Sequence, residues 1–336
     1  MLHRLYGQIA RARRGWYERR AGAQRHLARP VISVGNLSVG GTGKTPLVAA
    51  LAAWLVAEGE RPAILSRGYA RRDRTPEPTV VSDGERVLAA VFAAGDEPLM
   101  LARAVPRARV IVGADRVASG RLAEGTLGAT VHLLDDGFQH VQLARDLDIV
   151  VTTAGALSTD HVLPKGRLRE PIDTLSRAAV LVVVGADQAA AAAEAARFGV
   201  PLGVAATRRL GAPVTVSGGV PPPGARVVAL AGIGAPSQFV TALAAQGWQV
   251  MATRPFADHH WYSAADLAAV ARLVEAHGAW GVLTTDKDAV RLEPLGALPC
   301  AVARVPMTLE VPRWAALTDQ VRAAVASGRA ATGARP

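Results

Sequence analysis

A glycine-rich segment near the start of the chain has the residue types and spacing of a phosphate-binding loop. It reads Ser38-Val-Gly-Gly-Thr-Gly-Lys-Thr-Pro46, after a short apolar run and before a helix-patterned one. Glycines let backbone N–H groups converge on one anion, and the N-terminus of the following helix adds positive potential. In such a loop Lys44 reaches the terminal phosphates and Thr45 holds Mg²⁺, although Ser38 replaces the usual first glycine. The predicted nucleotide-binding residues are Ser38, Gly40, Gly41, Thr42, Gly43, Lys44 and Thr45.

Two adjacent acids, Asp135 and Asp136, close a second apolar run at 131–134. A carboxylate at the end of such a strand can bind Mg²⁺ directly or through water. Side chains of neighbouring strand residues point in opposite directions, so a turn at Gly137 would be needed to bring both acids to one site. A helix-capping or turn role is the alternative.

Further candidates for proton transfer lie in two loops. Asp96 opens a predicted helix, where it either caps the helix or serves as a base for an acceptor hydroxyl. Asp258, His259 and His260 precede another predicted helix and could orient a group or handle a proton, with a surface loop as the alternative.

Lysine is rare in this chain. Of 38 basic residues only three, Lys44, Lys165 and Lys287, are lysine. Where arginine replaces lysine wherever it can serve, lysine is expected to persist where a compact ammonium is required. Lys165 and Lys287 are therefore candidate site residues, with chance survival as the alternative.

The positive charge is concentrated at the start of the chain. The net charge is +10, and residues 1–30 hold eight arginines and one acid. Apolar residues at helical spacing among them indicate a basic amphipathic helix, either at a membrane surface or packed on the domain. A nucleic-acid-binding arm is a further alternative, but no motif known to recognise nucleic acid accompanies these arginines. A spanning helix and a secretory leader are not expected. The single cysteine, Cys300, excludes an intramolecular disulfide and a cysteine-rich zinc site.

Apolar strand-like runs alternate with helical patterns, which predicts an α/β fold with a parallel sheet flanked by helices. A smaller α/β domain should follow a proline-rich linker, and the sequence end should fray. The expected parts are a helix at 1–30, a core at 31–215, a linker at 216–224, a smaller domain at 225–325 and a flexible tail at 326–336. In the core, strands are expected at 31–34, 63–65, 110–112, 131–134, 149–151, 180–184 and 202–205.

Taken together, several motifs resemble the bacterial tetraacyldisaccharide 4'-kinases, also called lipid A kinases. They lie in family order over most of the chain, and the combination of the loop with DDGFQH is far more specific than the loop alone. The resemblance implies a P-loop NTPase-like fold and transfer of the ATP γ-phosphoryl group, with Mg²⁺, to the 4'-hydroxyl of an acylated glucosamine disaccharide lipid. The matching strings are GNLSVGGTGKTP at 35–46, LSRGY at 65–69, GDEP at 95–98, GADR at 113–116, LLDDGFQH at 133–140, GRLREP at 166–171, FADHH at 256–260 and TTDKDAVR at 284–291.

The resemblance also implies roles for particular residues. Asp96 matches the catalytic carboxylate and His259 its paired imidazole. Because these two lie in different predicted domains, domain closure on ligand binding is expected. The metal-binding candidates are Thr45, Asp135, Asp136 and Glu170, and the other site candidates are Arg116, His140, Asp258, Lys165 and Lys287.

The resemblance further implies a peripheral protein at the cytoplasmic face of the bacterial inner membrane, with no nucleic-acid partner and no obligate protein partner. The main rival is a membrane-associated P-loop ATPase regulated by a protein partner. Many such ATPases carry an extra lysine early in the loop, where this chain has Val39.

Overall fold

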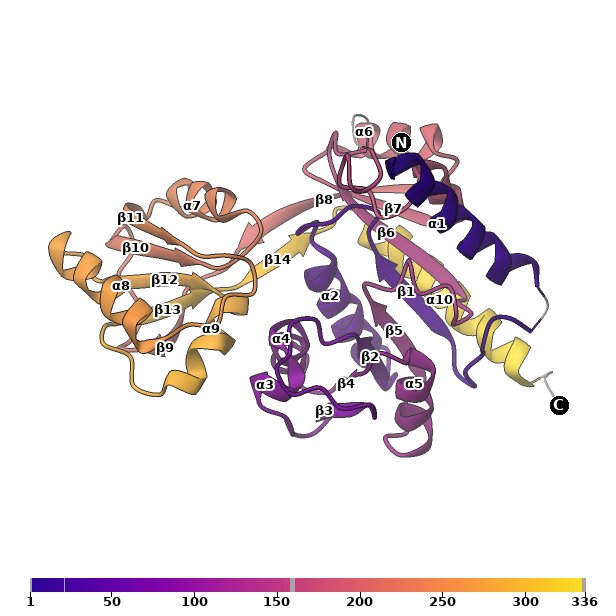
Figure 1. The fold of residues 1–336 in the computed structure, drawn as a ribbon, viewed down its shortest axis with the longest axis horizontal. Coiled ribbons are helices and arrows are strands. Elements are labelled where there is room, and N and C mark those ends of the chain that lie inside the picture. The colour runs from indigo at the N-terminus through magenta and orange to yellow at the C-terminus, as the bar shows by residue number, and fades with distance from the viewer. Residues whose placement is uncertain (1, 21, 158–160, 334–336) are drawn as a thin grey trace. The chain divides into compact units, whose positions relative to one another are not determined.

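A computed structural model describes residues 2–20, 22–157 and 161–333. These residues form two compact units, each with its own sheet (Figure 1). The first unit runs to Ala94 and includes Leu101–Arg208 and the residues from Leu309 onward. The second comprises Gly95–Met100 and Arg209–Thr308. Within the described residues, no helix is both long and apolar enough to cross a membrane.

The first unit is built on a nine-stranded sheet in the order β14-β8-β7-β6-β1-β5-β2-β4-β3. From β8 to β4 the paired strands are parallel, and β3 is antiparallel to β4. The central strands are short apolar runs buried on both faces, as a helix-covered parallel sheet requires. The strands are β1 (Val31–Gly35), β2 (Pro62–Ser66), β3 (Thr79–Asp83), β4 (Arg109–Val112), β5 (Val131–Asp135), β6 (Leu147–Thr153), β7 (Val180–Val184), β8 (Leu202–Leu210) and β14 (Met307–Glu310).

Helices follow most of these strands, and the α/β fold predicted from the sequence is confirmed. Helix α2 packs on β1, β2 and β5, while the C-terminal helix α10 packs on β1 and β6. The helical elements are α1 (Leu2–Arg19), α2 (Lys44–Ala57), α3 (Val91–Ala94), α4 (Asp96–Ala104), α5 (Arg116–Gly125), η1 (Ile172–Arg177), α6 (Gln188–Arg197) and α10 (Trp314–Gly333).

The second unit contains a five-stranded sheet in the order β11-β10-β12-β13-β9. Its strands are parallel except for β9, which is antiparallel to β13. The elements are β9 (Val214–Ser217), β10 (Arg226–Ala231), α7 (Pro236–Ala245), β11 (Gln249–Pro255), α8 (Ala264–Ala276), β12 (Gly281–Thr285), α9 (Asp286–Leu292), η2 (Glu293–Leu295) and β13 (Val302–Val305).

Two boundaries differ from the sequence-based expectation. The expected linker at 216–224 begins inside β9, which pairs with β13. Residues 326–333 of the expected flexible tail are helical, because α10 continues through them, and α10 belongs to the first unit, not to the smaller domain. Val321 and Val325 are buried on that helix, and Arg329 forms a 2.6 Å ion pair with Glu60. The alanine- and arginine-rich composition concealed this pattern.

Helix α1 is drawn in indigo in Figure 1. Its buried residues are Gly7 and Arg14, and its large apolar residues are exposed. At about 100° per residue, Leu2, Leu5, Ile9 and Trp16 fall on one narrow face. These side chains are exposed, by 70 % for Leu2 and 59 % for Ile9. The buried residues lie on the opposite face and include Arg14. The helix therefore presents an apolar stripe to its surroundings.

Candidate active site

The glycine loop between β1 and α2 has the backbone conformation that an anion site requires. Gly40 and Gly43 adopt left-handed backbone conformations, with φ of 111° and 103°. A side chain at Gly40 would collide with the guanidinium of Arg167. Gly43 occupies the N-cap of α2 and has no side chain to bond to the first-turn N–H groups. Those groups and the positive end of the helix dipole are therefore available to phosphate.

The segment around 166–170 holds this loop in place. The backbone N–H of Val39 donates to the carbonyl of Arg167, and the Arg167 side chain donates back to the Val39 carbonyl, both at 2.8 Å. Arg208, at the end of β8, donates to the Gly41 carbonyl at 2.8 Å. Sequence reasoning did not single out Arg167 or Arg208 as loop contacts, because neither lies near the loop along the chain.

The parallel register of β1 and β5 pairs Val34 with Asp135, so both strands end at the same edge of the sheet. Asp135 is buried and accepts a 3.4 Å hydrogen bond from Ser66. Asp136 follows in a left-handed conformation, with φ of 57°, so the turn begins one residue earlier than the predicted turn at Gly137.

Asp136 joins the loop lysine to a further arginine. Its Oδ1 lies 3.5 Å from Lys44 Nζ, and its Oδ2 accepts a 2.6 Å bond from Arg169. Burial acts to raise the pKa of Asp136, but Lys44 and Arg169 together lower it below its ordinary value. Asp136 is therefore a carboxylate at neutral pH. The lysine and this acid, expected separately from the sequence, lie side by side.

Arg116 and His140 lie in the same region of the first unit. Arg116 is buried, and its Nη1 donates to the carbonyls of Gly113 and Ala114. Burial lowers its pKa to about 10. Burial and the charge of Arg116 lower the pKa of His140 to about 4, so its imidazole is neutral at physiological pH.

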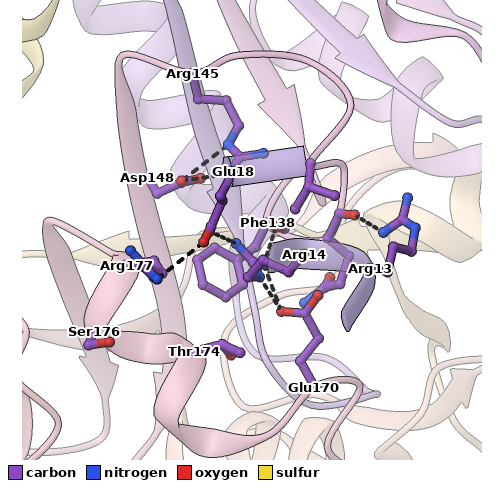
Figure 2. Close-up of polar contacts among 12 residues, drawn as sticks. Arg13, Arg14, Glu18, Phe138, Arg145, Asp148, Glu170, Thr174, Ser176 and Arg177 are labelled. Carbon is purple, nitrogen blue, oxygen red and sulfur yellow. Dashed lines mark hydrogen bonds and ion pairs between the residues drawn. The ribbon is translucent and has the colours of Figure 1, made fainter. Parts of the chain in front are cut away.

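Glu170, which was expected to bind metal, contacts helix α1. Its Oε2 accepts bonds of 3.0 Å from Nε and 2.6 Å from Nη2 of Arg14 in α1 (Figure 2). Both side chains are buried. In this structure the long-range partner of Glu170 is therefore a cation, and its expected role as a metal ligand stays a prediction. Lys165, another candidate, is exposed in the loop that carries Arg167.

Asp96 and His259 were expected in different domains, but both belong to the second unit, together with the other expected proton-transfer residues. His259 Nδ1 lies 3.1 Å from Asp96 Oδ2, and His259 Nε2 lies 3.1 Å from Lys287 Nζ. Lys287 also contacts Asp258 at 2.8 Å. Arg291 is almost fully buried and contacts both Asp96 and His259 Nδ1. Asp96 is the first residue of α4, and these partners are side chains, which favours the functional role over helix capping.

The His259 ring has a perturbed environment. Burial and then the charge of Lys287 lower its pKa below the usual value, so the ring is neutral at pH 7. Sequence reasoning missed Arg291, which lies in the TTDKDAVR string but was not distinguished there from the other arginines. Arg291 lies four residues after Lys287 in α9, so the two side chains share one face of that helix.

No group of three or more metal-binding side chains occurs within the described residues. Mg²⁺ in nucleotide enzymes, however, is often held by one or two carboxylates together with substrate phosphates. Asp135, Asp136 and the Thr45 hydroxyl supply hard oxygen atoms of that kind. The donor set therefore fits a magnesium–nucleotide complex better than a metal held by protein alone.

The fold and the loop define a P-loop nucleotide-binding protein. The family model described as tetraacyldisaccharide-1-P 4'-kinase matches residues 1–326, and the chain belongs to this family of lipid kinases. The chain is 42 % identical over 339 residues to the tetraacyldisaccharide 4'-kinase of Anaeromyxobacter sp. (strain Fw109-5), covering 96 % of this chain and 90 % of that protein. It is 41 % identical over 293 residues to the Geobacter sulfurreducens protein of the same name, covering 86 % and 82 %.

A solved structure agrees. The crystal structure of the Aquifex aeolicus LpxK in complex with ATP has a TM-score of 0.77 and 32 % identity, and the match covers 96 % of this chain and 97 % of that one. The resemblance inferred from the motifs is thereby confirmed.

Proposed function

We propose that this chain transfers the γ-phosphoryl group of ATP to the 4'-hydroxyl of a tetraacyldisaccharide 1-phosphate, a step in lipid A biosynthesis. Its relatives carry the name of that reaction, and the Aquifex structure contains ATP. The observation that carries the chemical part of the proposal is the contact of the buried Asp96 carboxylate with His259. A buried acid paired with a neutral imidazole can accept a proton from an alcohol.

The hydrogen-bond donors around His259 limit which ring nitrogen can carry the proton. Lys287 and Arg291 can only donate, and a neutral imidazole has one donor and one acceptor nitrogen. Lys287 Nζ lies 3.1 Å from Nε2, and Arg291 Nη2 lies 2.8 Å from Nδ1, so a neutral ring can accept from only one of these two cations at a time. A proton on Nδ1 would let the ring donate to Asp96 and accept from Lys287 at Nε2, and it requires Arg291 to donate to Asp96 instead of to the ring.

This arrangement prepares Asp96 for its proposed role. His259 Nδ1, Lys287 Nζ and an Arg291 nitrogen all lie on one oxygen, Oδ2. These three groups surround Oδ2, with Lys287 Nζ 3.9 Å away, and orient the carboxylate so that Oδ1 is the oxygen left to accept the acceptor hydroxyl proton. His259 orients this carboxylate instead of taking the proton itself.

The phosphates of ATP are bound by the first unit. Lys44 and the first-turn N–H groups of α2 would contact them, and Asp136, 3.5 Å from the lysine, holds it in position. We propose that Asp135, Asp136 and Thr45 hold Mg²⁺, which neutralises phosphate charge when bound. Most of the rate enhancement then comes from positioning and charge neutralisation.

We further propose that α1 docks on anionic bilayers at the cytoplasmic face of the inner membrane, as a peripheral element. The apolar stripe of Leu2, Leu5, Ile9 and Trp16 matches the acyl region in chemistry. Exposed arginines such as Arg4 and Arg13 would attract acidic headgroups. The proposed lipid acceptor lies in that same phase.

The direct test uses γ-labelled ATP, Mg²⁺, the full chain and tetraacyldisaccharide 1-phosphate in detergent. Label is expected in the lipid at the 4'-position. ATP hydrolysis without labelled lipid would reject the kinase proposal and favour the partner-regulated ATPase. Omission of Mg²⁺ should abolish transfer, while transfer that continues in excess chelator would remove the metal from the proposal.

A further inference from the structure

Arg14 is a buried cation on an otherwise exposed helix. Among the described residues of α1, only Gly7 and Arg14 are buried. The Arg14 guanidinium bonds to Glu170 and donates from Nη2 to the carbonyl of Phe138 at 2.8 Å. It also lies 4.5 Å from the centroid of the Phe138 ring (Figure 2). One side chain therefore contacts two segments that are far apart in the sequence.

Each of those segments carries a residue of the nucleotide site. Phe138 follows Asp136 by two residues, and Glu170 directly follows Arg169. The 2.6 Å bond from Arg169 to Asp136 joins the two segments directly. Arg14 joins them a second time, through the Phe138 carbonyl and the Glu170 carboxylate.

The second connection is a strong one. Side-chain exposure is 4 % for Arg14 and 5 % for Glu170. Removing one partner of a buried pair leaves an uncompensated charge, which is far more costly than the loss of a surface pair. The pair formed by Arg11 of the same helix with Asp173 is a surface pair, with exposures of 55 % and 61 %.

We infer that Arg14 is a positioning residue for the nucleotide site. By fixing the segment 136–138 against 169–170, it keeps the Asp136 carboxylate where it holds Lys44, 3.5 Å away. The helix that we propose for membrane docking is thus directly tied to the residues that bind phosphate. The kinase part of the test rests on the proposed function, whereas the ATP-binding part does not.

The test compares four variants of the full chain: Arg14→Met, Arg14→Lys, Arg14→Met/Glu170→Met and the matched control Arg11→Met. Isothermal titration with ATP and Mg²⁺ gives the Kd, lipid phosphorylation in detergent gives kcat and KM, and a thermal melt reports folding. Loss of charge-assisted bonds at Arg14 should raise the ATP Kd and KM about tenfold or more. Arg11→Met should stay within about twofold of the unaltered protein, because surface ion pairs contribute little.

The double variant separates positioning from folding. Replacing both buried charges with apolar side chains should restore the melting temperature, because no unpaired charge remains. If Arg14 positions the site, the ATP Kd of the double variant stays raised. A Kd that returns to the original value together with the melting temperature would overturn the inference.

Arg14→Lys tests the planar bridge itself. Lysine keeps the charge but lacks the rigid fork that reaches two partners, so partial recovery of ATP affinity is expected. Full recovery would refute the bridging role. If the unaltered protein fails to label the lipid while Arg14→Met still weakens ATP binding, the proposed function fails and this inference stands.

Discussion

At the scale of single residues, two candidate site positions have unusual backbones. Asp136 and His259 have φ of 57° and 62°, in the region that favours glycine. Non-glycine residues there cost on the order of 1–3 kcal/mol each and persist only where their surroundings hold them. Asp136 is held by Lys44 and Arg169, and His259 by contacts with cations and Asp96. The strain falls where positioning matters for the proposed reaction.

The role of Asp96 can be tested by removing its charge. Asp96→Asn should lower kcat by about 10²–10⁴-fold, the usual contribution of general acid–base catalysis. ATP affinity should change little, because the phosphate-binding residues lie elsewhere. Stopped-assay kinetics and an ATP titration on the same preparation measure both. Full turnover in this variant would exclude Asp96 as the base.

The pH dependence should respond to Lys287. Burial and the charge of Lys287 lower the pKa of His259, so the ring stays neutral to a lower pH than an ordinary histidine would. Lys287→Met removes the second cause, raises this pKa and moves the acid limb of kcat/KM to higher pH. The charged groups that face His259 are Asp96, Glu97, Asp258, Lys287, Asp288 and Arg291.

The matched control for that profile is Lys165→Met. Lys165 is the other lysine outside the glycine-rich phosphate loop, and it lies in the first unit. Its acid limb should coincide with that of the unaltered protein. An acid limb that stays in place in Lys287→Met, or that moves to lower pH, would contradict the assignment of a neutral His259.

At the scale of elements, α1 is an amphipathic helix whose apolar face is exposed and whose opposite face is buried. A surface helix usually packs its apolar stripe on the core. Here Gly7 and Arg14 face inward, and Gly7 lies against Val162 and Pro171. Packing by a glycine and an ion pair leaves the apolar stripe free for another phase. The packed-helix interpretation from the sequence describes the buried face, whereas the membrane-surface interpretation of the exposed face stays a proposal.

Charges placed in the apolar stripe should weaken membrane binding. Leu5→Glu/Ile9→Glu should reduce co-sedimentation with vesicles containing anionic lipid by more than about tenfold, since burying each such side chain contributes about 1.5–3 kcal/mol. The melting temperature should be retained, because Leu5 and Ile9 are 54 % and 59 % exposed. Unchanged vesicle binding would mean that α1 is not the docking element.

At the scale of the whole molecule, the proposed chemistry is divided between two units. Lys44 and the acid pair belong to the first unit, and Asp96 with His259 and Lys287 to the second. The second unit takes residues 95–100 from a helix whose remainder belongs to the first. Phosphoryl transfer needs both groups of residues to act on one ATP.

We therefore expect the two units to change their arrangement on ligand binding. Small-angle scattering should give different curves without ligand and with a non-hydrolysable ATP analogue plus lipid acceptor. The analogue alone serves as the control for the effect of nucleotide. Identical curves in all three states would contradict the expected closure.

The local features of this protein could be read from its sequence. The glycine loop, the strand–acid pairing at Asp135 and the alternating strands and helices all depend on residues close together in the chain. Short apolar runs and glycine spacing predict these features, because backbone hydrogen bonding and steric freedom are local properties. The same holds for Asp96 and His259, whose motifs carried the family resemblance.

Only the tertiary structure decided which side chains are the ion-pair and hydrogen-bond partners of the candidate site residues. Glu170 meets Arg14 across 156 positions, and Arg169 meets Asp136 across 33. Arg291 is buried against His259, although the sequence gives an arginine no mark that distinguishes it from the others. Such contacts depend on which charges folding buries together, since a buried carboxylate needs a nearby cation wherever the chain supplies one. The sequence determined which groups we propose for the chemistry, and only the fold determined what holds each of them in place.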